Sequence, residues 1–282
     1  MGKPEAIEPN APFNVDKAEL VRRLAAVLRP GCLLHETEEL KPYECDGLSA
    51  YREVPLAVAL PEDEAQVAAT LRVCHQLKVP VVARGAGTGL SGGAMPHAQG
   101  VLLGLSKMKR ILEVDPVARI ARVQPGVRNL AISEAAAPHG LYYAPDPSSQ
   151  IACSIGGNVA ENSGGVHCLK YGLTVHNVLK LRTVTIEGEI VEIGSDGLDA
   201  PGYDLLALLI GSEGRFSQSV AQTCTTLMLS GMAFRTSSQR STNLSISMVS
   251  SSTMKNSGAP LASAVSSAIR ALRQTPNTLG WM

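Results

Sequence analysis

A glycine-rich segment carries the clearest chemical signal in the sequence. Residues 84–93 read Arg-Gly-Ala-Gly-Thr-Gly-Leu-Ser-Gly-Gly and directly follow an apolar run at residues 79–83. Consecutive glycines let backbone N–H groups turn toward one anion, and they let a bulky phosphate come close to the chain. The segment therefore predicts a phosphate-binding loop at the end of a buried strand.

Several loop types compete for this segment. A P-loop requires Lys followed by Ser or Thr at its end, and that pair is absent here. Gly87, Gly89 and Gly92 match the spacing of a dinucleotide-binding fingerprint, but Pro96 and His97 follow where its helix should begin. We favour a pyrophosphate-binding loop between a strand and irregular structure, with a plain glycine-rich surface turn as the alternative.

A second glycine-punctuated segment, residues 153–165, reads Cys-Ser-Ile-Gly-Gly-Asn-Val-Ala-Glu-Asn-Ser-Gly-Gly. A helix that starts near Gly157 would direct its N-terminal N–H groups at an anion or an electron-rich ring. A tight strand-to-helix junction would use the same small residues for close packing. On this segment alone, the junction is the simpler interpretation.

The elements that must position these segments are predicted to alternate between strand and helix. Asp16 and Glu19 form a candidate capping box for a helix over residues 16–29. Apolar runs at residues 55–60 and 79–83 flank a helical pattern at residues 62–77, which predicts a βαβ unit with parallel strands. Further strands are expected at 101–105, 111–114, 120–123 and, as a hairpin, 179–185 with 189–193, and helices at 127–139 and 204–210.

Composition narrows the class of protein. The 282 residues contain 25 Lys+Arg and 25 Asp+Glu, so the formal net charge of zero argues against a general electrostatic grip on nucleic acid or acidic lipid. The six cysteines show no CxxC or zinc-like spacing, which indicates reduced thiols and an intracellular protein. No apolar signal region or membrane-spanning segment is expected.

The charge balance changes abruptly after Gly214. Residues 215–282 contain no Asp or Glu and six of the 25 Lys+Arg, and they are rich in Ser and Thr. Such a segment has little apolar surface to offset its ordering entropy, so we expect a boundary between residues 1–214 and a largely disordered tail at 215–282. An out-of-frame or spliced extension would give this composition, and so would a genuine tail that docks on a partner.

Four segments in order resemble a known family: residues 84–93, Pro-Asp-Pro-Ser-Ser at 145–149, residues 153–165, and Gly-Ser-Glu-Gly at 211–214. They are similar to the FAD-binding half of the vanillyl-alcohol-oxidase-type (PCMH) flavoproteins, above all to the glycolate oxidase D-subunit and D-lactate dehydrogenase group. The resemblance covers roughly residues 15–214. It implies an α/β fold in which a PCMH-type domain of two small α/β subdomains holds FAD between them, with the cap domain missing.

The resemblance also implies which residues contact FAD. Around the diphosphate they would be Arg84, Gly85, Ala86, Gly87, Thr88, Gly89, Ser91 and Gly92. On the flavin side they would be Pro145, Asp146 and Ser148, with Cys153, Ser154, Gly156, Gly157 and Asn158 beneath the ring and ribityl chain. Glu161, Asn162 and Gly164 would complete that wall, and the adenosine end would be closed by Tyr171, Gly172, Gly211, Ser212, Glu213 and Gly214.

The same resemblance limits the chemistry that can be assigned. Family members with covalent flavin often carry His in the glycine loop, and Thr88 stands there instead, which predicts non-covalent FAD. The family continues from Gly214 into a buried strand and a cap domain with the substrate-binding Arg and the catalytic or metal-binding His residues. The acid-free segment begins there instead, so we expect no strand and assign no catalytic residue and no metal site.

The implied function is oxidation of a small 2-hydroxy acid of the glycolate or D-lactate type, with hydride transfer to flavin N5. Electrons would leave to a quinone or to partner subunits, a second flavin-type subunit and an iron–sulfur subunit. The protein would be cytoplasmic, or peripheral at the inner face of the plasma membrane through those partners. The alternatives are a non-catalytic FAD-binding or assembly subunit and a phosphate-binding module without redox chemistry.

Overall fold

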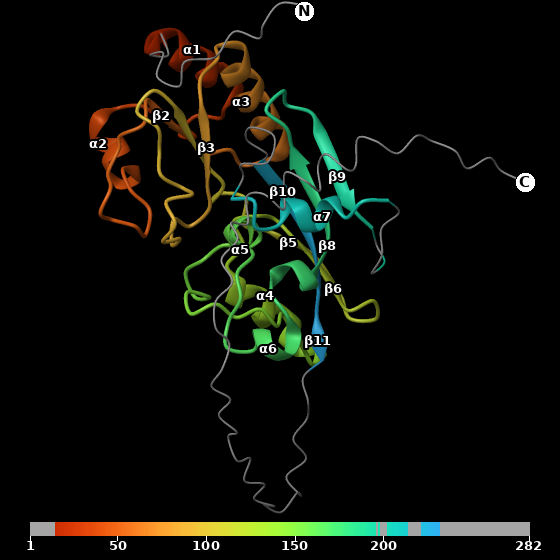
Figure 1. Cartoon of the computed structure of the whole chain (residues 1–282). Coiled ribbons are helices and arrows are strands. Elements are labelled where there is room, and N and C mark those ends of the chain that lie inside the picture. The colour runs from red at the N-terminus through yellow and green to blue at the C-terminus, as the bar shows by residue number, and fades with distance from the viewer. Residues whose placement is uncertain (1–14, 196, 198–201, 214–220, 232–282) are drawn as a thin grey trace, which may run out of the picture. The chain divides into compact units, whose positions relative to one another are not determined.

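The computed structural model describes residues 15–195, 197, 202–213 and 221–231, which all lie within the unit Met1–Phe234 (Figure 1). Two separate sheets organise these residues, one of four strands and one of five. A third pairing joins the short strands β7 (Leu141–Tyr142) and β11 (Ser230–Gly231). The two larger sheets form the two subdomains that the sequence predicts.

The first sheet has the order β1-β2-β4-β3. Its strands are β1 (Leu33–Leu34), β2 (Ala57–Ala59), β3 (Val81–Arg84) and β4 (Val101–Gly104). The last three run parallel, and β4 lies between β2 and β3, so the predicted βαβ unit brackets a strand from further along the chain. Every residue of β2 and β4 is buried, as is usual for parallel strands covered on both faces.

Helices α1 (Lys17–Val27) and α3 (Glu64–Gln76) pack on this sheet, and the short helices α2 (Thr37–Leu40) and η1 (Lys41–Tyr43) follow β1. The Asp16 carboxylate caps α1 by accepting from the N–H groups of Ala18 at 2.9 Å and Glu19 at 3.3 Å. The predicted N-cap is confirmed, but the Glu19 carboxylate bonds to Arg22 instead of completing a capping box. Asp63 caps α3 in the same way, through Gln66 N.

The second sheet is antiparallel, in the order β5-β6-β10-β8-β9. Its strands are β5 (Ile111–Asp115), β6 (Ile120–Val123), β8 (Val178–Val184), β9 (Ile190–Gly194) and β10 (Ala221–Met228). Gly188, with a φ of +79°, makes the turn of the predicted β8–β9 hairpin. The associated helices are α4 (Asn129–Ala136), η2 (Ala137–His139), α5 (Ile155–Glu161), α6 (Cys168–Tyr171), η3 (Thr174–Asn177) and α7 (Leu205–Leu209).

Strand β10 corrects the expectation that no strand follows Gly214. It is the middle strand of the second sheet, with Leu227 opposite Ala121 on β6 and Val178 on β8. Thr225 and Leu227 are fully buried. A central strand needs β-branched and apolar side chains rather than charges, so an acid-free composition does not prevent it. The other residues of the predicted tail, 215–220 and 232–282, lie outside the described residues.

The two subdomains share packing across their boundary. The core around α1, α3 and the first sheet includes Val184, which belongs to β8 of the second sheet. The second core is built from α4, α5 and the faces of β6, β8 and β10. The glycine-rich residues after β3 therefore lie opposite α5, which the second sheet supports (Figure 1).

Two smaller expectations concern the whole described chain. None of the six cysteines is in a disulfide, as the sequence predicts. Within the described ranges, no helix is both long enough and apolar enough to cross a membrane.

Candidate functional site

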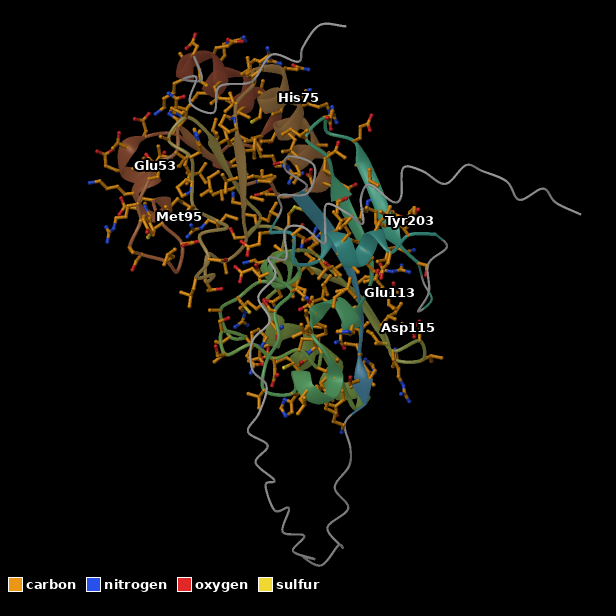
Figure 2. The ribbon with its side chains drawn as sticks, in the orientation of Figure 1. Glu53, His75, Met95, Glu113, Asp115 and Tyr203 are labelled. Atoms are coloured by element: carbon orange, nitrogen blue, oxygen red, sulfur yellow. The ribbon has the colours of Figure 1, made fainter. Side chains whose placement is uncertain are left out.

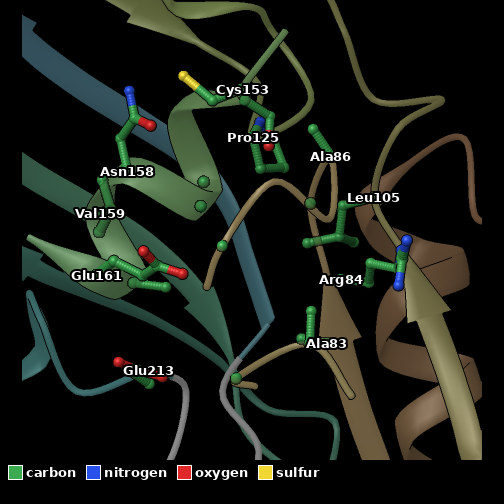
Figure 3. Close-up of a pocket in the computed structure, with 18 of the residues that line it drawn as sticks. Ala83, Arg84, Ala86, Leu105, Pro125, Cys153, Asn158, Val159, Glu161 and Glu213 are labelled. Atoms are coloured by element: carbon green, nitrogen blue, oxygen red, sulfur yellow. The ribbon is translucent and has the colours of Figure 1, made fainter. Parts of the chain in front are cut away.

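A cleft separates the glycine-rich loop after β3 from helix α5. Figure 3 shows Ala83, Arg84 and Ala86 on one side and Asn158, Val159 and Glu161 on the other. The cleft has about 1160 Å³ of space free of protein atoms, part of which is open to solvent. Cofactor sites often lie between domains or subdomains, as this cleft does.

The backbone of the glycine-rich loop is free to bind a ligand. Within the described part of the chain, no N–H group of residues 85–94 donates a hydrogen bond to the protein. Folded proteins satisfy most backbone donors, so such a run points to a ligand or to solvent. Gly87 and Gly92 have φ values of +71° and +77°, which side chains other than glycine rarely adopt. The loop therefore has the free donors that a phosphate-binding loop requires.

Helix α5 differs from the prediction in its start and in its donors. It begins at Ile155 rather than near Gly157. Its first two N–H groups, of Ile155 and Gly156, donate to Val127 O at 2.8 Å and Pro125 O at 2.9 Å. The loop after β6 therefore uses these two donors. Gly157 N has no protein partner among the described residues, so donation from this end of the helix to a ligand stays a prediction. The close packing of Gly156 on Pro125 bears out the junction interpretation in part.

Two buried polar atoms beside this junction lack a partner. Ser154 Oγ and Asn158 Nδ2 have no hydrogen-bond partner among the described residues. Both residues line the cleft and are buried, with exposed fractions of 4% and 2%. A buried polar group without a partner is costly, so these two atoms point to a ligand or ordered water in the cleft.

Gly157 presents open space to the cleft. A Cβ atom placed on Gly157 would meet only Ser154 Oγ, at 3.6 Å. By contrast, a Cβ on Gly156 would lie 2.8 Å from Pro125 Cβ. Glycine is therefore needed for packing at Gly156, whereas at Gly157 it keeps the cleft free.

Charged side chains of both signs line the cleft. The guanidinium of Arg84 donates to Cys45 O at 2.6 Å, lies 5.9 Å from the Tyr43 ring and packs against Gly87 of the loop. Glu161 and Glu213 lie on the opposite side (Figure 3). Burial, together with the charges of Glu213 and Asp46, raises the pKa of Glu161.

Most of the predicted site residues come together here. Those that line the cleft are Arg84, Gly85, Ala86, Gly87, Thr88, Gly89, Cys153, Ser154, Gly156, Gly157, Asn158, Glu161, Ser212 and Glu213. Ser91 and Gly92 line a separate hollow with Met95, although Ser91 Oγ donates to Glu213 Oε2 at 3.2 Å. Gly214 lies outside the described residues.

Other predicted residues serve the cleft indirectly. Asn162 ends α5 with a φ of +51° and accepts from Val175 N at 2.9 Å, and Gly211 N donates to Val159 O. Gly164 packs against Leu173. These contacts support the wall of the cleft, although Asn162, Gly164 and Gly211 are not themselves on its lining.

Asp146 and Tyr171 belong to a polar cluster outside the cleft lining, and Pro145, Ser148 and Gly172 are not on the lining either. Asp146 Oδ2 lies 2.6 Å from His167 Nδ1. The Tyr171 ring meets Tyr142 edge to face at 5.9 Å. Burial raises the pKa of Tyr142 to about 12, and the hydrogen bond from Tyr142 lowers the pKa of Tyr171. Tyr171 and Gly172 are thus not on the lining with Glu213, and their assignment to the same end of the ligand stays a prediction.

None of the six histidines, all of which are among the described residues, lines the cleft. His167 and His176 each make a local polar contact, with Asp146 and with Leu173 N. His75 is exposed on α3, away from the cleft, and Met95 lies at the edge of the glycine-rich region (Figure 2).

Sequence reasoning missed a second set of lining residues. Some of them lie within the segments already singled out or next to one of them: Ala83, Gly93, Ala94, Ser149, Val159, Ala160 and Ser163. The others come from separate elements that only the fold brings to the cleft: Leu105, Pro125, Leu181, Thr183 and Leu209.

The fold and the cleft define a class of protein, an α/β domain that binds an anionic organic cofactor between two subdomains. A family model described as an FAD binding domain matches residues 55–194. The chain belongs to this family of flavoproteins, which confirms the resemblance to the PCMH type. FAD fits the cleft because free loop donors, the open face of Gly157 and the partnerless Ser154 and Asn158 would contact a long, polar ligand.

Curated relatives are similar over the same region. The glycolate oxidase subunit GlcD of Escherichia coli (strain K12) is 66% identical over 202 residues, 71% of this chain and 40% of the relative. GlcD of Bacillus subtilis (strain 168) is 42% identical over 61% of the chain and 37% of the relative. A D-lactate dehydrogenase of Archaeoglobus fulgidus is 42% identical over 56% and 35%. The chain thus spans about 40% of the length of the relatives it matches.

Solved structures show the same fold. An alkyldihydroxyacetonephosphate synthase matches 76% of this chain and 40% of its own with a TM-score of 0.67 at 22% identity. A variant of Phl p 4, described as a glucose oxidase, matches 75% of this chain and 44% of its own with a TM-score of 0.63 at 18% identity. The predicted fold class is therefore confirmed.

Proposed function

We propose that this chain is the FAD-binding part of an oxidoreductase that oxidises a small 2-hydroxy acid of the glycolate or D-lactate type. The proposal depends most on one observation, the free backbone donors of the glycine-rich loop, whose residues 85–89, 93 and 94 line the cleft. The names of the relatives, glycolate oxidase subunit and D-lactate dehydrogenase, support the substrate class.

The chain's own residues bind and orient the cofactor. The loop donors would hold its diphosphate, as charge-assisted hydrogen bonds are short and strong. Ser154 and Asn158 would pair with polar atoms of its ring or ribityl chain, and Leu105 and Leu181 would exclude water from that end. When bound, FAD supplies a ring whose N5 accepts a hydride from the substrate Cα. Thr88 offers no imidazole for a covalent link, so the cofactor would be held by these contacts alone.

The experiment that tests this proposal uses the purified chain with added FAD. We expect it to retain flavin through gel filtration, and to bleach under anaerobic conditions with glycolate or D-lactate but not with L-lactate. A chain that takes up no FAD would contradict the proposal. It would favour a phosphate-binding module without redox chemistry.

The charges of the cleft favour a second candidate, a non-catalytic FAD-binding or assembly subunit. A 2-hydroxy acid carries a carboxylate that needs a cationic partner. Arg84 is the one cationic side chain among the described residues on the lining, and it is bonded to Cys45 O. Stable FAD binding without bleaching by any 2-hydroxy acid would support this candidate over the enzyme.

Partner subunits are the third part of the proposal. A relative named as a glycolate oxidase subunit supports assembly into a multi-subunit enzyme. The partners would be a second flavin-type subunit and an iron–sulfur subunit, which would accept the electrons. Co-purification from cells that express all three chains, compared with this chain alone, tests the assembly directly.

A further inference from the structure

Two carboxyl groups lie against the loop that would hold the cofactor's diphosphate. Glu161 Oε1 occupies the position that a Cβ atom on Gly89 would need. Glu213 Oε2 lies 2.5 Å from the Cβ position of Gly93 and accepts a hydrogen bond from Ser91 Oγ. The loop is thus bracketed by two acids, one from α5 and one from the residues after α7.

The positive charge near the loop lies at a different part of it from these acids. The Arg84 guanidinium lies against Gly87 and is bonded to Cys45 O, whereas the two carboxyl groups lie against Gly89 and Gly93 (Figure 3). A diphosphate held along the loop would therefore meet Arg84 at one part and two carboxyl groups at the other, and like charges at close range repel.

The groups that surround Glu161 set which carboxyl takes up a proton. Asp46 faces it from the segment before β2, buried, with Oδ2 lacking a partner among the described residues. Glu213 faces it from the residues after α7. On η3, which packs against α5, the His176 ring is turned to Leu173 N. Negative groups thus surround Glu161, and protonation of its carboxyl removes the repulsion of an incoming anion.

We propose that Glu161 makes the affinity for FAD depend on pH. The diphosphate binds to the loop with the Glu161 carboxyl protonated, so one proton is taken up per FAD bound. This inference rests on the proposed function, because it takes FAD as the ligand. The raised pKa of Glu161 in the ligand-free protein agrees with it, and a bound diphosphate adds a further negative charge beside the carboxyl.

The test measures the FAD dissociation constant by flavin fluorescence between about pH 5 and about pH 8, in EDTA. Uptake of one proton weakens binding by up to about tenfold per pH unit above the pKa of Glu161. We expect Glu161→Gln to bind FAD with a nearly flat pH profile and more tightly than wild type at the alkaline end. Glu213→Gln should shift the wild-type profile to lower pH, because it removes one of the neighbouring charges.

A matched control is Glu134→Gln, an exposed glutamate on α4 away from the cleft, which should keep the wild-type profile. The second measurement uses wild-type protein only: FAD added in weak buffer should take up close to one proton per site. A wild-type profile that is flat, or a Glu161→Gln profile as steep as wild type, overturns the inference. Binding that requires Mg²⁺ overturns it too. If wild type binds no FAD at any pH, the proposed function itself fails.

Discussion

Arg182 on β8 forms a two-pronged ion pair with Glu64 on α3. The Arg182 Nε and Nη2 atoms donate to the two Glu64 carboxylate oxygens at 2.7 and 2.9 Å. The pair joins the first helix after β2 to the second sheet, so it links the two subdomains that enclose the cleft. The carboxylates of Glu64 and Glu192 raise the pKa of Arg182, which keeps the guanidinium charged.

Breaking this pair should loosen the boundary between the subdomains. We expect Arg182→Gln to lower the free energy of unfolding by about 1 kcal/mol, because a partly exposed ion pair is worth that much at most. A double-mutant cycle with Glu64→Gln, measured by denaturant unfolding at low and high salt, isolates the pair. A coupling energy of zero at low salt would show that the pair does not link the subdomains.

Leu227 tests whether β10 is a structural strand. Its side chain is fully buried between β6 and β8, so Leu227→Ala should cost about 2–5 kcal/mol of unfolding free energy. Val117→Ala is the control, since Val117 is 93% exposed and should change stability by less than about 0.5 kcal/mol. Equal melting temperatures for the two variants would mean that the segment after Gly214 does not enter the sheet.

A substitution at Gly157 should weaken cofactor binding without affecting folding. Gly157→Ala puts a methyl group into open cleft space and improves the helix propensity of α5, so we expect weaker FAD retention with no loss of thermal stability. Gly231→Ala, where a Cβ meets nothing within 4 Å, should retain FAD as wild type does. Unchanged FAD affinity in Gly157→Ala, measured by fluorescence titration, would place the cofactor elsewhere.

Non-covalent binding predicts complete release of the flavin on denaturation. After acid precipitation, we expect all flavin in the supernatant, because Thr88 has no imidazole nitrogen to form a link. Flavin that stays with the pellet would contradict this. Cys153→Ser would then show whether the buried Cys153 thiol on the cleft lining is the attachment point.

Glu161 should make the ligand-free protein less stable as pH rises. Its folded-state pKa is raised, so its stability contribution is complete below the ordinary glutamate pKa and falls as pH increases through the folded value. Glu161→Gln should therefore melt at a higher temperature than wild type near neutral pH. At about pH 4, wild type and Glu161→Gln should have the same melting temperature. Identical melting curves at both pH values would contradict the raised pKa.

The glycine-rich loop, the caps of α1 and α3 and the β8–β9 turn were predictable because each depends on neighbouring residues. Asp16 and Asp63 stand directly before the helices that they cap. Gly188 supplies the left-handed backbone of its own turn. Local chemistry of this kind is visible in a short window of sequence.

The place of β10 could not be predicted in this way. Its composition argued against a strand, yet β6 and β8 leave room for one between them, and Leu227 fills that position. The start of α5 was misplaced because it also depends on distant residues. The carbonyls of Pro125 and Val127, which accept from its first N–H groups, lie about thirty positions earlier in the chain. Pairing partners far apart in the chain decide both features.

The sequence by itself determined the two glycine-rich segments that suit an anionic ligand, because small residues leave main-chain donors free, and it implied FAD through the resemblance of four ordered segments to a flavoprotein family. Only the tertiary structure decided which of those donors stay free and which charges face them. The Glu161 and Glu213 carboxyl groups meet the loop from two elements about fifty residues apart in the numbering. Their repulsion depends on distance in space, which no spacing along the chain expresses.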